Sequence, residues 1–210
     1  PETELARRSG ADPYDLLVQA AAAEPAGSRG LCFLPYLTGE RTPHADPYAT
    51  GAYIGITPQT TKGAMARAIV EGVCFSLRES LDIFRELKLP VSEIRVTGGG
   101  AKNPFWRQTL ADVFGAETCA LAAAEGPAYG VALLAAVGTG AFKSVEEACA
   151  ATVRTCEPLR PDPNRARVYA RGYPLWKNLY RSLKGNFEEL SRAAGSKGAV
   201  EKLLLHFDPP

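Results

Sequence analysis

The sequence predicts an α/β domain in which a mixed sheet is flanked by helices. Two short strand candidates come first, at residues 30–36 and 51–57, and their pattern fits hairpin-like pairing. Helix, strand, helix, strand and helix then follow one another from residue 61 to the end of the last helix pattern. Locally paired strands followed by such alternation are typical of a sheet that carries both kinds of strand pairing, with helices packed on it.

The first helices have clear boundary signals. Asp12 can cap a helix that ends near Glu24, before Pro25. Residues 61–87 carry apolar side chains at three- and four-residue steps, which predicts a long helix with one buried face. That face would consist of Met65, Ile69, Val73, Leu77, Leu81 and Phe84. Arg67 and Glu71 on the same helix are interpreted as a weak i,i+4 ion pair, with a contribution of about 0.2–0.5 kcal/mol.

The second half of the chain carries signals for one strand and several helices. A helix from Pro104 would bury Phe105, Leu110, Val113 and Phe114. Residues 117–122 form a strand candidate. The small residues of 126–137 predict a helix that packs very closely on a sheet or another helix. Ser144 is expected to cap a further short helix. A C-terminal helix opens at 162–164, and Pro174 is expected to bend it. Its core face would be Val168, Tyr173, Trp176, Leu179, Tyr180, Leu183 and Phe187.

Composition excludes several classes of function. The formal net charge is +1, and no basic block interleaved with aromatic residues is present, so nucleic acid is not an expected partner. No apolar run has the length of a membrane span, so no membrane is expected. Five cysteines without a C-x-x-C pair favour reduced thiols and a cytoplasmic location. Two histidines supply no convincing zinc site or Ser-His-Asp triad, so no protein metal site is expected.

The most informative segment is residues 93–108, where a strand candidate meets a helix through Gly98, Gly99 and Gly100. Glycines allow close ligand approach and positive φ, and ligands of open α/β sheets bind at the carboxyl ends of strands. The segment is not a dinucleotide fingerprint, because Asn103 stands where the third glycine belongs. No P-loop is present either. A nucleotide-binding turn and a purely structural turn both remain open on these residues alone.

Three blocks in fixed order resemble the carbohydrate kinases of the FGGY family. They are residues 33–43, residues 51–57 continuing to 66–72, and residues 98–108, and the resemblance spans roughly residues 30–190. Within the family, the sequences of residues 39–43 and 106–108 are most similar to those of the xylulokinases.

The resemblance implies an actin-like ATPase fold, which is ribonuclease H-like, and transfer of the γ-phosphoryl group of ATP to a sugar hydroxyl. In xylulokinases this is the 5-hydroxyl of D-xylulose, and the Mg²⁺ ion is carried by the nucleotide. By position, Gly99, Gly100 and Ala101 would line the adenosine and α-phosphate, Asn103 would reach the adenine or ribose, and Gly98 would shape the turn. ATP or ADP is thus the expected ligand.

The family's catalytic aspartate and most of its sugar contacts belong upstream of the point that matches Pro1. No catalytic residue is therefore assigned in this chain, and Asp12, Asp15, Asp46 and Asp82 match no such motif. The chain also lacks an initiator methionine, so it is either a processed product or a piece of a longer protein. The expected organisation is a nucleotide-binding C-terminal domain at residues 1–195 and a loosely held tail at 196–210. The resemblance further implies that the N-terminal sugar-binding and catalytic domain is not part of this chain, so the chain alone is expected to be catalytically incomplete.

Several points stay open at this level. Arg41 helps neutralise a transferred phosphate or, as favoured here, forms a structural ion pair with Glu40 or another acid. His44 either touches substrate at a domain cleft or, as favoured here, is an exposed loop side chain. Tyr14 either stacks near a nucleotide base or, as favoured here, does not. A nonenzymatic nucleotide-binding or scaffolding module of the same fold is the alternative to a kinase, and the sugar could also be ribulose, gluconate, fuculose or glycerol. An exposed apolar face predicts a homodimer or poor solubility.

Overall fold

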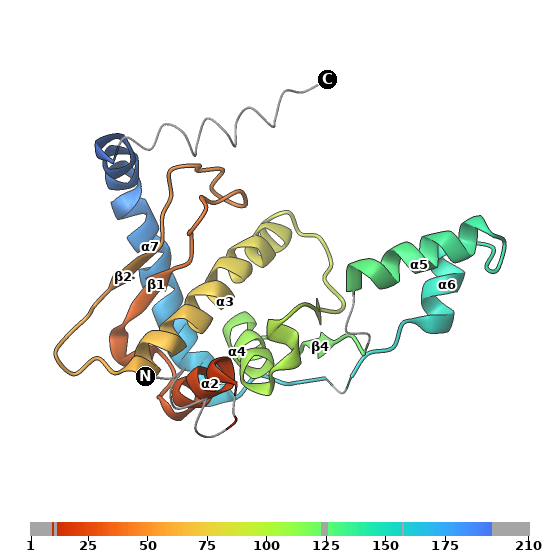
Figure 1. The fold of residues 1–210 in the computed structure, drawn as a ribbon, viewed down its shortest axis with the longest axis horizontal. Coiled ribbons are helices and arrows are strands. Elements are labelled where there is room, and N and C mark those ends of the chain that lie inside the picture. The colour runs from red at the N-terminus through yellow and green to blue at the C-terminus, as the bar shows by residue number, and fades with distance from the viewer. Residues whose placement is uncertain (1–9, 11, 123–125, 157, 195–210) are drawn as a thin grey trace. The chain divides into compact units, whose positions relative to one another are not determined.

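The computed structural model describes residues 10, 12–122, 126–156 and 158–194. The chain divides into two compact units, Pro1–Leu87 with Arg167–Pro210 and Lys88–Ala166. Figure 1 traces the elements of both units. The expected tail at 196–210 lies outside the described residues. No helix in the described ranges combines the length and the apolar character that crossing a membrane requires.

The first unit is built on one antiparallel strand pair and three helices. It contains α2 (Pro13–Ala23), the short turn η1 (Ser28–Gly30), β1 (Cys32–Leu34), β2 (Ala52–Ile54), α3 (Lys62–Glu86) and most of α7 (Pro163–Ala193). Phe33 pairs with Tyr53 across β1 and β2, as the hairpin-like prediction required. The side chains of Asp12 and Thr61 accept hydrogen bonds at the starts of α2 and α3, so both predicted helix starts are confirmed.

The buried face of α3 differs from the prediction. Ile69, Leu77 and Phe84 are 39%, 48% and 49% exposed, whereas Ala64, Ala68 and Gly72 are buried. A Cβ atom on Gly72 would lie 2.2 Å from the carbonyl oxygen of Phe33, and one on Gly63 would lie 2.6 Å from that of Ala20. Only residues without large side chains allow α2 and β1 to approach α3 this closely. The face with these small residues, which also includes Val70 and Phe75, is therefore the inner one, and the prediction of the larger apolar stripe was wrong.

The aromatic stripe of α7 is core, as predicted. Tyr173, Trp176, Tyr180 and Phe187 are buried, and the indole Nε1 of Trp176 donates a hydrogen bond of 2.8 Å to the carbonyl oxygen of Phe33. Two details differ: Tyr169 was missed although only 1% of it is exposed, and Val168 is 42% exposed. The helix continues through Pro174.

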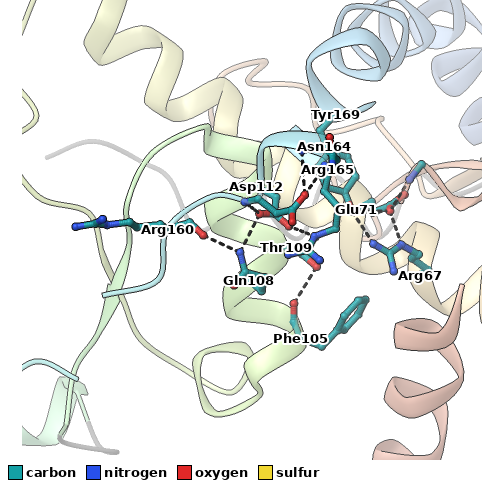
Figure 2. Close-up of polar contacts among 12 residues, drawn as sticks. Arg67, Glu71, Phe105, Gln108, Thr109, Asp112, Arg160, Asn164, Arg165 and Tyr169 are labelled. Carbon is teal, nitrogen blue, oxygen red and sulfur yellow. Dashed lines mark hydrogen bonds and ion pairs between the residues drawn. The ribbon is translucent and has the colours of Figure 1, made fainter. Parts of the chain in front are cut away.

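A charged pair lies inside this unit. Arg67 Nε and Glu71 Oε1 are 2.7 Å apart, and each side chain is only 4% exposed (Figure 2). The Glu71 carboxylate also accepts hydrogen bonds from the hydroxyls of Tyr169 at 2.9 Å and Ser28 at 2.7 Å. Arg67 donates to the Glu24 carbonyl at 2.7 Å and to the Tyr169 hydroxyl at 2.8 Å. The predicted ion pair is confirmed, but its interpretation as a weak helical pair is wrong, because it joins α2, η1, α3 and α7 in the core.

The second unit contains the glycine turn. Its elements are β3 (Arg95–Val96), η2 (Gly100–Lys102), α4 (Pro104–Phe114), β4 (Cys119–Ala120), α5 (Gly126–Gly138) and α6 (Val145–Thr152). β3 and β4 are parallel, with Val96 opposite Ala120. On the other side of β4 the chain is antiparallel, with bridges from Thr118 to Leu159 and from Leu121 to Thr155. Parallel and antiparallel pairing therefore meet at β4, as expected for a mixed sheet. The regular strands are short, and β1 and β2 form a separate two-stranded sheet.

Two helices complete this unit with different degrees of burial. Leu110, Val113 and Phe114 of α4 are buried, in agreement with the prediction, whereas Phe105 is only partly buried. The close packing predicted for α5 is limited: α5 packs on α6, but Leu133 is its only buried residue in the described range, and Val131 is 67% exposed. The side chain of Ser144 caps α6, as predicted.

Asp112 of α4 holds the segment that leads into α7. Its Oδ1 accepts hydrogen bonds from the backbone N–H of Asp162 at 2.7 Å and from Gln108 Nε2 at 2.9 Å, and its Oδ2 pairs with Arg165 Nε (Figure 2). The side chain of Asp162 in turn accepts from the backbone of Asn164 and Arg165. The start of α7 is thus capped where the sequence predicted.

Candidate nucleotide site

The glycine turn between β3 and α4 is a tight backbone structure. Gly98 has φ +89°, a value that favours glycine, while Gly99 has right-handed helical angles. The amides of Ala101 and Lys102 donate to the carbonyls of Gly98 and Gly99, each at 3.2 Å. The turn therefore satisfies much of its own backbone. Its outer surface is open, because a Cβ atom added at Gly98 or Gly99 would meet no heavy atom within 4 Å.

A hollow of about 290 Å³ opens beside this turn. It is formed where the turn and α4 meet the ends of β4 and the antiparallel segment after α6. Its walls are Thr97, Gly98, Ala101, Lys102, Arg107, Ala120, Leu121, Ala122 and Cys156. The hollow therefore lies at the carboxyl ends of β3 and β4, the edge at which ligands of open α/β sheets bind.

The expected site residues take different positions. Gly98 and Ala101 line the hollow, whereas Gly99 and Gly100 lie between them in the turn and are not among its walls. Asn103 is the N-cap of α4: its Oδ1 accepts hydrogen bonds from the backbone N–H groups of Phe105 at 2.9 Å and Trp106 at 3.4 Å. Asn103 is also not among the walls of the hollow, and its side-chain amide nitrogen takes no part in the cap.

Sequence reasoning missed most of the other walls. Lys102 and Arg107 stand within the singled-out segment, and their positive charge beside a glycine turn was a signal that pointed to an anion. Ala120, Leu121, Ala122 and Cys156 carry no such signal. Only the pairing of β4 with β3 and with the segment after α6 brings them to the turn.

Cys119 of β4 and Cys156, whose backbone N–H donates to the carbonyl oxygen of Ala120, differ in exposure. Burial, with a hydrogen bond to Glu93, raises the pKa of the Cys119 thiol to about 11. Cys156, by contrast, is exposed at the wall of the hollow. Since the thiolate is the reactive form, Cys119 is protected from alkylation and Cys156 is accessible to it.

The loop at residues 38–48 belongs to the first unit. The Glu40 carboxylate accepts a hydrogen bond of 2.8 Å from the backbone N–H of Thr42, and Arg41 is exposed. The proposed pairing of Arg41 with an acid stays a prediction. His44 is not an exposed side chain: it stacks on Tyr180 with ring centroids 3.8 Å apart, and its Nε2 lies 3.1 Å from buried Glu79. Tyr14 is 49% exposed on α2.

The four aspartates that match no catalytic motif have structural positions. Asp12 caps α2, Asp46 accepts a hydrogen bond of 2.9 Å from Tyr180, and Asp82 accepts one of 2.7 Å from Tyr173. Asp15 is exposed in the first turn of α2. Within the described ranges, no group of three or more His, Cys, Asp or Glu side chains is arranged to hold a metal ion.

Comparison with known proteins places this geometry in a family. Residues 2–139 match the family described as "FGGY family of carbohydrate kinases, C-terminal domain". These residues include parts of both compact units. The chain belongs to the FGGY family of carbohydrate kinases. The resemblance of the three sequence blocks is thereby confirmed.

Individual FGGY relatives support the same assignment. The xylulose kinase of Bacillus subtilis (strain 168) is 40% identical over 82% of this chain and 35% of its own length. The gluconokinase of Bacillus licheniformis is 34% identical over 90% of this chain and 37% of its own length. The crystal structure of ligand-bound xylulose kinase from Lactobacillus acidophilus superposes with a TM-score of 0.76 at 30% identity, covering 90% of this chain and 39% of that one.

These matches establish the fold class as α/β and actin-like. They also show that the chain spans only about a third of the length of the curated relatives it matches.

Proposed function

We propose that this chain is the nucleotide-binding part of an ATP-dependent FGGY sugar kinase that converts D-xylulose and ATP to D-xylulose 5-phosphate and ADP. The observation that carries the proposal is the position of the glycine turn. Gly98 and Ala101 line a hollow at the carboxyl ends of β3 and β4, in a chain whose family transfers phosphoryl groups to carbohydrates. The xylulose kinases among its relatives favour xylulose as the sugar.

In this proposal the turn residues bind and orient the nucleotide. Gly98, Gly99, Gly100 and Ala101 lie against the adenosine and α-phosphate, and the amide nitrogen of Asn103 donates to the adenine or ribose. The fit to an anionic ligand rests on the walls of the hollow, which include Lys102 and Arg107. ATP supplies the transferred phosphoryl group, and Mg²⁺ is carried by its phosphate oxygens.

The chain alone is expected to be catalytically incomplete. Phosphoryl transfer needs a group that orients the attacking hydroxyl, together with sugar contacts that place it in line. Asp12, Asp46 and Asp82 are already engaged in hydrogen bonds within this chain. We expect the orienting group and most sugar contacts in the part of the related kinases that this chain does not cover.

Calorimetry and cysteine alkylation together test nucleotide binding. Titration of the 210-residue chain with ADP and Mg²⁺ should give saturable binding. Because Cys156 lines the hollow, bound ADP should slow its alkylation by a maleimide, as followed by mass spectrometry. Cys149 is partly exposed and is not a wall of the hollow, so its alkylation rate is the internal control. Absence of ADP binding, in conditions where an intact relative binds ADP, would refute the proposal.

Gluconate is the second candidate sugar, because the matched gluconokinase aligns with 90% of this chain. Assays of the full-length protein with xylulose, gluconate, ribulose, fuculose and glycerol would separate these substrates. Failure with every sugar despite firm ADP binding would favour the nonenzymatic nucleotide-binding module instead.

Self-association and a cytoplasmic location are further parts of the proposal. Exposed apolar side chains such as Leu77, Phe84 and Val131 favour a homodimer or poor solubility. Sedimentation velocity over a range of concentrations tests this, and a monodisperse monomer at high concentration would contradict it. The five cysteines are free thiols, which is the usual state in cytoplasmic proteins.

A further inference from the structure

The hollow beside the glycine turn has an uneven charge. Among the described residues that form its walls, Lys102 and Arg107 are the charged side chains, and none is a carboxylate. Three other arginines of this unit are paired with acids: Arg95 with Glu93, Arg160 with Glu117 and Arg165 with Asp112. The hollow therefore concentrates positive charge at one place.

Arg107 carries an unsatisfied donor at this place. Its Nε atom is buried and has no hydrogen-bond partner within the part of the chain that the structure describes. A buried guanidinium N–H without an acceptor is unfavourable, and such groups in native structures call for an explanation such as a ligand. The side chain of Arg107 is also a wall of the hollow, so an anionic oxygen bound there would lie beside its guanidinium.

The backbone N–H groups at the start of α4 already donate hydrogen bonds within the chain. The N–H groups of Phe105 and Trp106 donate to Asn103 Oδ1, and the N–H of Arg107 donates to the carbonyl oxygen of Asn103 at 3.1 Å. Helix N-termini usually bind phosphate through such free amides. Here the cap occupies them, so recognition of negative charge passes to side chains.

We propose that Arg107, assisted by Lys102, binds the phosphate oxygens of the nucleotide in this hollow. The inference rests on the proposed nucleotide site and adds to it residues that discriminate a nucleotide from a nucleoside. Guanidinium is suited to this task because its planar donors match phosphate oxygens and it is always charged. Lys102, which is exposed, contributes as a point charge.

Calorimetry with ADP and with adenosine separates the two parts of the ligand. Arg107→Gln should weaken ADP binding roughly ten- to hundredfold, as expected for loss of a charge-assisted hydrogen bond, and leave adenosine binding unchanged. Arg107→Lys should fall between the two proteins, and Lys102→Gln should have the same direction with a smaller effect. Arg181→Gln, an exposed arginine on α7, is the matched control and should leave both ligands unaffected.

Three outcomes would overturn the inference. Wild-type ADP affinity in Arg107→Gln would overturn the inference but not the proposed function. An equal loss of adenosine and ADP binding in this variant would do the same. A wild-type chain that binds neither ligand would overturn the proposed function as well. Circular dichroism shows whether Arg107→Gln is folded. If it is not, wild-type ADP affinity in exposed Lys102→Gln, with no weakening of ADP binding at high salt, would refute the inference.

Discussion

Arg67 and Glu71 form an ion pair of 2.7 Å in which each side chain is 4% exposed. Burial disfavours the charged guanidinium, but its hydrogen bond to Tyr169 and its ion pair with Glu71 more than offset this, so the pKa of Arg67 is raised. The pair and its neutral partners connect three helices of the first unit. A pair of this kind is costly to break from one side, because the remaining charge stays buried.

We expect Glu71→Gln to lower the free energy of unfolding by about 3–5 kcal/mol, because Arg67 loses its counter-charge in the core. Urea denaturation followed by tryptophan fluorescence measures this. Glu188 and Arg192 form an exposed pair at the same i,i+4 spacing on α7, so Glu188→Gln is the matched control. Its cost should be about 0.3–0.5 kcal/mol. Equal effects at the two sites would contradict the importance given to burial.

Gly98 and Gly99 should respond differently to alanine. At Gly98 the φ of +89° strains any side chain, so Gly98→Ala should cost roughly 1–2 kcal/mol of stability. Gly99 has helical angles and open space around its Cβ position, so Gly99→Ala should fold with unchanged or slightly increased stability. In the proposed site a ligand approaches this backbone, and Gly99→Ala should then weaken ADP binding. Thermal melts and calorimetry measure both effects, and full ADP affinity in Gly99→Ala would argue for a purely structural turn.

Two variants separate the capping role of the Asn103 side-chain oxygen from the proposed ligand-binding role of its amide nitrogen. Asn103→Asp keeps an oxygen that caps α4 and places negative charge at a helix N-terminus, so stability should be preserved. Asn103→Ala removes the cap and should cost about 0.5–2 kcal/mol. Both variants lose the amide nitrogen, so both should bind ADP more weakly. Wild-type ADP affinity in the aspartate variant would restrict Asn103 to capping.

The first unit should be sensitive to alkali. Burial is the main cause of a raised pKa for four tyrosines that are also hydrogen-bonded, namely Tyr36, Tyr169, Tyr173 and Tyr180. Above pH 10, the usual pKa of tyrosine, these hydroxyls keep their protons in the folded state and lose them on unfolding. The unfolded state then binds fewer protons, so stability falls as pH rises above about 10.

Denaturation midpoints between about pH 8 and about pH 11.5 test this expectation. Tyr169→Phe removes one of the four groups, so its midpoint should fall less steeply with pH even if the variant is less stable at about pH 8. Parallel pH profiles for the wild type and Tyr169→Phe would show that this hydroxyl does not contribute.

Several features were predictable from short stretches of sequence. Asp12, Thr61 and Asn103 each cap a helix within three residues of themselves, so local hydrogen bonding determines where α2, α3 and α4 begin. Gly98 likewise has the positive φ that a glycine turn suggests. The family resemblance added the expected ligand, which composition and periodicity do not contain.

Other features depended on distant parts of the chain. The apolar period of α3 is compatible with more than one inner face, and the close approach of β1 to Gly72 selects the face with small residues. His44 was expected to be exposed, but packing against Tyr180 and Glu79 buries most of it. Neither partner is near it in sequence, so no local pattern could have indicated the contact.

By itself, the sequence determined the helix starts, the glycine turn and the family, because capping, positive φ and motif order are properties of neighbouring residues. Tertiary structure alone decided that Arg67 and Glu71 are buried, because burial depends on the helices that close around them. It also decided that Arg107 and Cys156 face one hollow, because strand pairing brings residues far apart in sequence to the same edge of a sheet.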